Sequence, residues 1–145
     1  MVVNIKKLDE RATIPTYGTQ YSAGADLYAM LDGDVCIQPS ETILIHTGIS
    51  VEIPEGYAGL IYARSVLASK KGLAPANKVG VVDADYRGEV MVALHNHGSV
   101  AQTVSNGERI AQLVIAPFLK AEFNLVDDLT ETDRGQGGFG STGTK

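Results

Sequence analysis

The sequence predicts an all-β fold, a jelly-roll-like β-barrel with one short helix and a flexible glycine-rich C-terminal arm. Short apolar or alternating runs recur along most of the chain. Turn-forming residues such as Asp32-Gly33, Pro54-Glu55-Gly56 and Ser105-Asn106-Gly107 separate these runs. Many short strands at this spacing are typical of β-sandwiches and jelly-roll barrels.

The individual elements follow from the same pattern. Only Ser65–Lys71 has helical character, with Ser65 available as an N-cap and Gly72 able to close the last turn. The predicted strands, in chain order, are Val2–Ile5, Ala25–Met30, Val35–Ile37, Thr42–Ile45, Ile49–Ile53, Tyr57–Ala63, Val79–Val82, Val90–Leu94, Ala101–Val104, Ile110–Phe118 and Glu122–Val126.

Composition limits the classes of function. A chain of 145 residues with 44% apolar content is large enough for one core. The net charge of −5 argues against nucleic-acid binding, whereas a small phosphorylated ligand needs only a few placed arginines. The single cysteine, Cys36, lies in an apolar run, so we expect it in the core. The N-terminus has no apolar run long enough for a signal peptide or a membrane span, which predicts a cytoplasmic protein.

The C-terminal segment combines glycine with groups that bind nucleotides. Residues 134–143 read RGQGGFGSTG. Glycine lets backbone N–H groups converge on an anion, arginine binds phosphate, and Phe139 can stack on a base. We therefore divide the chain into a barrel domain, residues 1–126, and a linker with a mobile C-terminal flap, residues 127–145. A disordered glycine-rich terminus is the alternative interpretation.

A second polar motif interrupts the strands between Val81 and Val90. Asp83 and Asp85 follow two apolar residues, and Tyr86 comes next. A carboxylate at the mouth of a strand can orient a water molecule as a general base. The alternative is a polar β-turn in which Asp83 caps backbone N–H groups and Gly88 supplies an unusual dihedral angle.

Other polar residues stand in apolar surroundings. Arg64 and Ser65 at the start of the short helix offer a cation, a hydroxyl and free N–H groups for an anion. Their alternative is a helix cap beside a surface arginine. Asp26 can pair with an arginine or lie near a metal, or be purely structural. Arg109 and Gln112 interrupt a strand and could form a surface salt bridge and an edge-strand amide.

The histidines carry no catalytic motif. His95 and His97 flank Asn96, but no further ligand follows at zinc-site spacing, so we expect a solvated turn. His46 lies on a predicted strand. The sequence has no Ser-His-Asp set, no Walker loop and no dinucleotide-binding glycine fingerprint.

Five motifs in a fixed order give the chain a family resemblance. They are AGADLYA, ARSVLA, NKVGVVDADYRGEV, GERIAQL and RGQGGFGSTG, and they extend from Ala23 to Gly143. With these motifs the chain resembles the homotrimeric deoxyuridine triphosphatases. The resemblance implies a homotrimer with active sites shared between subunits. It also implies Mg²⁺-dependent hydrolysis of dUTP to dUMP and pyrophosphate, which limits uracil incorporation into DNA and supplies dUMP for thymidylate synthesis.

The resemblance also implies a role for each matching residue. Asp83 would orient the water that attacks the α-phosphate in line, and Tyr86 would pack under the deoxyribose. Asn77 and the backbone as far as Val82 would read the uracil edge. Asp26 would help position Mg²⁺ through water, with the ion held mainly by the triphosphate. The remaining substrate-binding residues would be Arg64, Ser65, Gln112, Arg134, Phe139, Gly140, Ser141 and Thr142.

Two residues depart from the family pattern, and two other functions compete. Val66 stands where the family usually has glycine, and Glu108 replaces a common aspartate. A dCTP deaminase shares the fold and parts of the motifs, but Tyr86 and the intact tail favour the triphosphatase. A non-catalytic nucleotide-binding module would not need the water-orienting Asp83.

Overall fold

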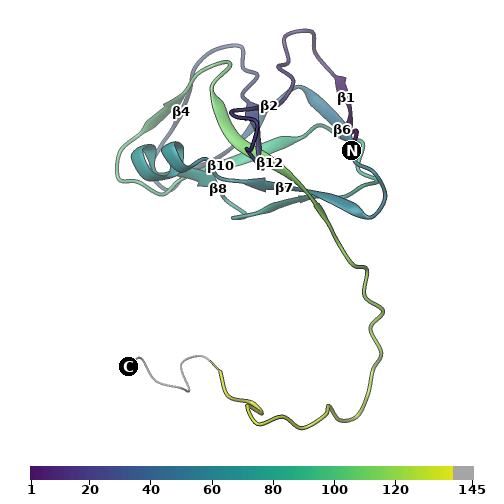
Figure 1. Cartoon of the computed structure of the whole chain (residues 1–145). Coiled ribbons are helices and arrows are strands. Elements are labelled where there is room, and N and C mark those ends of the chain that lie inside the picture. Colours follow the sequence, from purple (N-terminus) through teal and green to yellow (C-terminus); the bar gives the residue numbers. More distant parts are fainter. Residues whose placement is uncertain (139–145) are drawn as a thin grey trace.

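The computed structural model describes residues 1–138 and forms an antiparallel β-barrel (Figure 1). This confirms the predicted all-β, jelly-roll-like fold. The strands are β1 (Asn4–Lys7), β2 (Thr16–Tyr17), β3 (Ala25–Tyr28), β4 (Val35–Ile37), β5 (Thr42–His46), β6 (Ile49–Glu52), β7 (Tyr57–Tyr62), β8 (Leu73–Pro75), β9 (Gly80–Val82), β10 (Met91–Asn96), β11 (Gln102–Val104) and β12 (Arg109–Pro117).

The strands form four antiparallel groups. The largest sheet has the order β2-β3-β12-β7-β9, and a second sheet has the order β5-β10-β8. Two further pairs, β1-β6 and β11-β4, complete the barrel. Strand β12 pairs with both β3 and β7, so it brings residues from distant parts of the sequence into one row.

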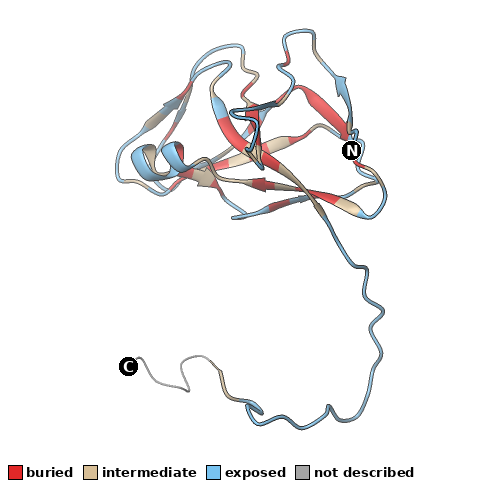
Figure 2. Cartoon of the chain, in the orientation of Figure 1, coloured by how far each residue is buried: buried red, intermediate tan, exposed pale blue. Residues whose placement is uncertain are grey.

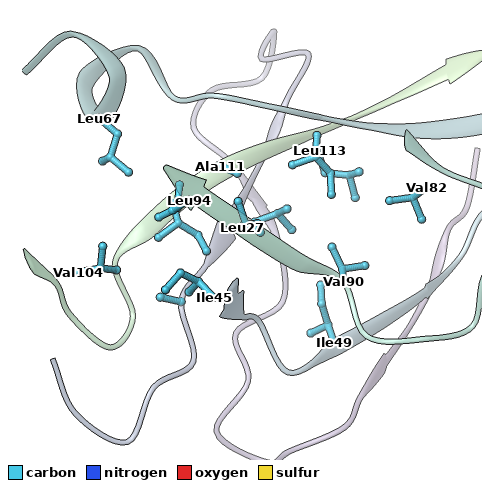
Figure 3. Close-up of a cluster of buried hydrophobic side chains, with 14 of the residues drawn as sticks. Leu27, Ile45, Ile49, Leu67, Val82, Val90, Leu94, Val104, Ala111 and Leu113 are labelled. Carbon is cyan, nitrogen blue, oxygen red and sulfur yellow. The ribbon is translucent and has the colours of Figure 1, made fainter. Parts of the chain in front are cut away.

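Alternating side chains of these strands fill the core between the sheets. Buried segments line the inside of the barrel in Figure 2. Figure 3 shows the cluster in which Leu27, Ile45 and Leu94 pack together, and all three are fully buried. Each such side chain contributes about 1.5–3 kcal/mol through burial.

The one short helix forms where the sequence predicts it. It includes η1 (Leu67–Lys71), a single π-helical turn. Gly72 closes it in the left-handed conformation, with φ of 65° and its N–H donated to the Leu67 carbonyl, as expected. The expected Ser65 cap is wrong, because the residue before the turn is Val66 and it makes no side-chain cap hydrogen bond.

Two further sequence-based expectations are wrong, and two strands were missed. The predicted strand Glu122–Val126 does not form, and Phe123 is 94% exposed. Cys36 is exposed rather than buried, because the short strand β4 points Ile37 inward instead. The missed strands are β2 and β8, which have only two and three residues.

After β12 the chain leaves the barrel as an extended arm (Figure 1). The Phe118 N–H still donates to the Gly56 carbonyl at 3.1 Å. Beyond it, Leu119 and Leu125 are 97% and 98% exposed, so these apolar side chains have no packing partner among residues 1–138. Within residues 1–138, no helix has both the length and the apolar character needed to cross a membrane.

Candidate active site

One row of polar side chains crosses the five-stranded sheet. The register pairs Thr16 with Asp26, Asp26 with Gln112, and Gln112 with Tyr62. Directly paired residues of adjacent strands point to the same face of a sheet. The register therefore places Asp26, Gln112 and Tyr62 side by side although they lie far apart in the sequence.

This row forms part of a pocket of about 560 Å³. The start of the helical segment closes one side of the pocket. The lining residues are Gly18, Ser22, Ala23, Gly24, Asp26, Tyr62, Arg64, Ser65, Val66, Arg109, Gln112 and Val114. Four of the sequence-predicted site residues thus meet in one pocket, namely Asp26, Arg64, Ser65 and Gln112.

Two arginines share one carboxylate in this pocket. Arg64 Nε donates to Asp26 Oδ1 at 2.7 Å, and Arg109 Nη1 donates to Asp26 Oδ2 at 3.2 Å. The side chain of Asp26 is only 12% exposed. Two cations against one anion leave a net positive charge, and each guanidinium keeps further N–H donors. The pocket therefore suits a phosphate chain.

Local backbone geometry positions two further pocket residues, Gln112 and Val66. Gln112 Nε2 donates to the Ala63 carbonyl at 2.9 Å. Gly24 makes room for this side chain, since a Cβ there would lie 2.5 Å from Gln112 Oε1. Val66 has ordinary helical angles, φ −66° and ψ −43°, so valine is accommodated here without the conformational freedom of glycine.

A second pocket of about 250 Å³ gathers another four predicted site residues, Asn77, Val82, Asp83 and Tyr86. Asp83 directly follows the last residue of β9, and its side chain is exposed. Among the described residues its carboxylate has no hydrogen-bond or ion-pair partner. An unengaged carboxylate at a strand end can accept a hydrogen bond from a water molecule.

The hairpin before β9 carries Asn77 on a tight turn. Lys78 adopts a left-handed conformation with φ of 64°, which is unusual for a residue with a side chain. The Val79 N–H donates to the Asn77 carbonyl at 2.7 Å, and the Lys78 N–H donates to the Pro75 carbonyl at 3.0 Å. The turn therefore exposes Asn77 at the edge of the second pocket.

The loop after Asp83 is a turn that presents Tyr86. The Tyr86 N–H donates to the Asp83 carbonyl at 3.2 Å, and the Tyr86 hydroxyl donates to the Glu89 carbonyl at 2.9 Å. The expected unusual dihedral at Gly88 is wrong, because Gly88 is absent from the glycines with positive φ. Glycine is needed for space instead, since a Cβ at Gly88 would lie 2.5 Å from Tyr86 Cζ.

The two pockets lie on opposite faces of strand β7. Tyr62 lines the first pocket and its neighbour Ile61 lines the second. Successive side chains of a strand point to opposite faces of the sheet. One chain thus holds two separate parts of the predicted site and does not bring Asp83 to the arginine pair.

The predicted tail residues lie away from both pockets or outside the described part. Arg134 lines neither pocket, and its Nε donates to the Gly137 carbonyl at 2.8 Å. Phe139, Gly140, Ser141 and Thr142 lie outside the described residues. The prediction of a closing flap stays a prediction.

The sequence interpretation missed two contributors to the first pocket. Arg109 was expected at most in a surface salt bridge, but its partner is the buried Asp26 and it lines the pocket. Tyr62 ends an apolar strand and carried no signal. The position of Arg109 inside an otherwise apolar run was the available signal, because such residues need a partner.

The histidine pair shows no metal site. His95 and His97 rings lie 4.4 Å apart, and His95 Nδ1 bonds to the Thr42 hydroxyl at 2.8 Å. Asn96 between them is buried, with Nδ2 donating to the Ile37 carbonyl at 2.9 Å. In residues 1–138 no three His, Cys, Asp or Glu side chains are placed to hold a metal ion.

The jelly-roll-like barrel, with two arginines in one pocket and an unengaged carboxylate beside another, is compatible with the class of β-barrel nucleotide hydrolases. The model of the dUTPase family matches residues 10–143, and the chain belongs to that family. The resemblance found in the sequence motifs is therefore confirmed.

Individual relatives agree with this assignment. The chain is 49% identical over 146 aligned residues to a deoxyuridine 5′-triphosphate nucleotidohydrolase of Burkholderia cenocepacia, with 99% of each chain covered. A mutant dUTPase of Staphylococcus bacteriophage 80alpha, solved with dUpNHpp, has a TM-score of 0.88 at 29% identity and 98% coverage of each chain. A mutant dUTPase from phage phi11 of S. aureus, whose structure reveals the coordination of a structural Mg(II) ion, has a TM-score of 0.81 at 25% identity, covering 90% of this chain and 100% of that one.

Proposed function

We propose that this chain hydrolyses dUTP to dUMP and pyrophosphate. The observation that carries the proposal is the unengaged Asp83 carboxylate, which borders the same pocket as Tyr86 and Asn77. Family membership and the named activity of the relatives supply the substrate. The paired arginines of the first pocket supply the charge for its three phosphates.

In the proposed reaction Asp83 orients a water molecule toward the α-phosphorus. The water oxygen forms the new bond to phosphorus, and the bond to the bridging oxygen on the opposite side breaks in line. Pyrophosphate leaves, and the proton of the water passes to the Asp83 carboxylate. Arg64, Ser65 and Gln112 hold the phosphates, so that the reaction depends on positioning and charge.

Mg²⁺ fits this site as a companion of the triphosphate. Both Asp26 oxygens are already engaged by guanidinium groups, so the described residues offer no all-protein cage. Mg²⁺ commonly binds through substrate phosphates and retains several water molecules. Bound in this way it would neutralise phosphate charge. Asp26 would contact it through water.

Selectivity for dUTP would come from the second pocket. Tyr86 would pack under the deoxyribose and leave no space for a 2′-hydroxyl. Asn77 and the backbone leading to Val82 would pair with the uracil edge, so that cytosine would leave buried polar groups unpaired. Closure of Arg134, Phe139, Gly140, Ser141 and Thr142 over the nucleotide would exclude water.

We also propose that the working unit is a homotrimer with shared sites. The two pockets lie on opposite faces of β7 in one chain, so a pocket of each kind must come from different subunits to meet one nucleotide. The arm leaves the barrel with exposed Phe123 and Leu125. The sixteen residues between Pro117 and Arg134 allow these two residues to lie at most about 60 Å apart. That reach allows it to serve a neighbouring subunit.

The proposed biological role follows from the reaction. Removal of dUTP limits uracil incorporation into DNA, and the product dUMP supplies thymidylate synthesis. We expect the enzyme to act in the cytoplasm on the free nucleotide, with no nucleic-acid or membrane partner.

A nucleotide panel tests the function. The protein is incubated with Mg²⁺ and each of dUTP, dTTP, dCTP and UTP, and both pyrophosphate and ammonia are measured. The proposal predicts pyrophosphate from dUTP far above the other three. Ammonia from dCTP would indicate the deaminase instead. Binding of dUTP without either product would indicate a non-catalytic nucleotide-binding module.

A further inference from the structure

We propose that Glu89 is a positioning residue that sets the sugar selectivity of the site by holding Tyr86. This inference rests on the dUTP hydrolysis proposed above. The Tyr86 hydroxyl donates to the main-chain carbonyl of Glu89 at 2.9 Å. The tyrosine ring is the expected wall against the deoxyribose. Contacts that fix the backbone of Glu89 therefore also fix the position of the Tyr86 ring.

The carboxylate of Glu89 is anchored to the turn between β5 and β6. Its Oε1 accepts from the Gly48 N–H at 2.7 Å and from the Thr47 N–H at 3.2 Å. Its Oε2 bonds to His46 Nδ1 at 2.8 Å. The side chain is only 20% exposed, so these bonds are largely shielded from water.

That turn is a rigid support. Gly48 has φ of 69°, and a Cβ there would collide with the side chain of Met30, so the turn is packed against the barrel. The Gly48 carbonyl accepts from the Leu8 N–H at 2.8 Å, and the His46 carbonyl accepts from the Met30 N–H at 2.8 Å. Two other segments of the chain, around Leu8 and around Met30, thus hold the turn that anchors Glu89.

The backbone on both sides of Glu89 takes part in the same arrangement. The Tyr86 ring lies against Gly88, where a Cβ would be 2.9 Å from Tyr86 Cε2. After Glu89, the Val90 N–H donates to the Ile49 carbonyl at 2.8 Å, and the Thr47 hydroxyl donates to the Val90 carbonyl. The Tyr86 ring therefore packs against residues 88–90, and the side chain of Glu89 attaches this segment to the β5–β6 turn.

The rest of the loop has independent anchors. Ser50 Oγ donates to the Arg87 carbonyl at 2.8 Å, and Arg87 Nη1 donates to the Ala84 carbonyl at 2.6 Å. Loss of the Glu89 carboxylate should therefore make the position of the Tyr86 ring less fixed, while the hydrogen bonds of Ser50 and Arg87 still hold the rest of the loop. Burial raises the pKa of Glu89, but the bonds from His46, Gly48 and Thr47 outweigh it and hold the pKa below its ordinary value. The anchor is charged at neutral pH.

The test compares kcat/KM for dUTP with kcat/KM for UTP. Loss of one orienting hydrogen bond corresponds to a change of about tenfold, so Glu89→Ala should lower the dUTP/UTP ratio by about that factor. Glu89→Gln should keep most of the ratio, because its amide oxygen still accepts from the Gly48 and Thr47 N–H groups. Tyr86→Phe should lower the ratio as well, and adding Glu89→Ala to Tyr86→Phe should change it no further.

Glu41→Ala is the matched control. Glu41 also accepts from a backbone amide, that of Gln38 at 2.7 Å, in a turn remote from Tyr86. Its removal should leave the ratio unchanged. An unchanged ratio in either Glu89→Ala or Tyr86→Phe overturns the inference while leaving dUTP hydrolysis intact.

A ligand-free measurement keeps the inference separate from the proposed function. The protein is labelled with ¹³C-tyrosine, and the ring resonances of Tyr86 are assigned by their loss in Tyr86→Phe. In Glu89→Ala the chemical shifts of these resonances should move toward those of an exposed tyrosine. In Glu89→Gln the chemical shifts should stay close to those of the wild type. Unchanged Tyr86 chemical shifts in Glu89→Ala would refute the claim that Glu89 positions the Tyr86 ring. If the wild type cleaves no dUTP, the proposed function fails, and this measurement still decides whether Glu89 positions Tyr86.

Discussion

Asp26→Asn tests whether the two arginines of the first pocket depend on one shared carboxylate. Asparagine keeps the size of Asp26 but removes its charge, and its Nδ2 group, a donor, must face a guanidinium donor. Asp26 is 12% exposed and Arg64 is 21% exposed, so their bond at 2.7 Å is largely shielded from solvent. Arg109 is 50% exposed, so solvent screens its bond to Asp26 more strongly.

Hydrogen bonds to charged groups contribute about 1.5–3 kcal/mol when shielded. With the screened Arg109 bond adding little, we expect Asp26→Asn to lower the free energy of unfolding by about 2–3 kcal/mol. For a chain of this size the melting temperature should fall by roughly 5–10 °C. KM for dUTP should rise by about tenfold, because Arg64 is no longer held toward the phosphates.

The assay is urea unfolding at one fixed protein concentration, since assembly changes apparent stability. Asp32→Asn is the matched control. Asp32 bonds to Arg11 at the same 2.7 Å, but its side chain is 93% exposed. Exposed ion pairs contribute little, so this variant should unfold like the wild type. If Asp26→Asn also unfolds like the wild type, the shared carboxylate does not stabilise the pocket.

Three further predictions follow from the site and the arm. Asp83→Asn should lower turnover by roughly 10²–10⁴ while Mg²⁺-dUTP binding, measured by calorimetry, survives; near-normal turnover would show that another group handles the water. Truncation after Asp133 should leave the melting temperature unchanged and abolish most activity. The substitution Phe139→Ala should weaken dUTP binding by only about 1–3 kcal/mol. A melting temperature lowered by truncation would mean that the arm stabilises the barrel. Because its interactions in the folded protein lower the pKa of Glu89, the charged carboxylate stabilises the fold at pH values above the ordinary glutamate pKa. The difference in free energy of unfolding between wild type and Glu89→Gln should shrink as the pH falls below that ordinary pKa and through the lower pKa of the folded protein. A difference that stays constant over this range would contradict the ionic anchor.

Most strands were predictable because short apolar or alternating runs stand between turn-forming residues. Strand β8 has three residues and takes its partners from β10, which no local pattern reveals. The run Glu122–Val126 has strand-like alternation, but it pairs with no strand in the part of the chain that the structure describes. Alternation of apolar and polar residues predicts that a segment can form a strand. Whether it pairs depends on a neighbouring strand in the folded protein.

The site was predictable in its residue types and less so in its arrangement. The motifs identified Asp26, Arg64 and Gln112, but only the register of β12 places Asp26 and Gln112 in one row. The pairing of Arg109 with Asp26 joins residues 83 positions apart, which sequence spacing cannot show. Gly88 was expected to supply a backbone angle, but it provides room for the Tyr86 ring.

The separation of the two pockets has a direct functional consequence. In the proposed shared-site trimer, Asp83 and the arginine pair that act on one nucleotide would come from different subunits. The arm, which leaves the barrel after Pro117, can then complete the site of a neighbouring chain. Catalysis would depend on assembly, and a dissociated subunit would be inactive.

Mixing two inactive variants tests this account most directly. One variant is truncated after Asp133 and retains Asp83; the other carries Asp83→Asn and retains the arm. Each alone should be nearly inactive on dUTP. After verified subunit exchange, some mixed trimers would combine an intact Asp83 with an intact donated arm, and part of the activity should return. If exchange is complete and no activity returns, the arm acts within its own subunit or the sites are not shared.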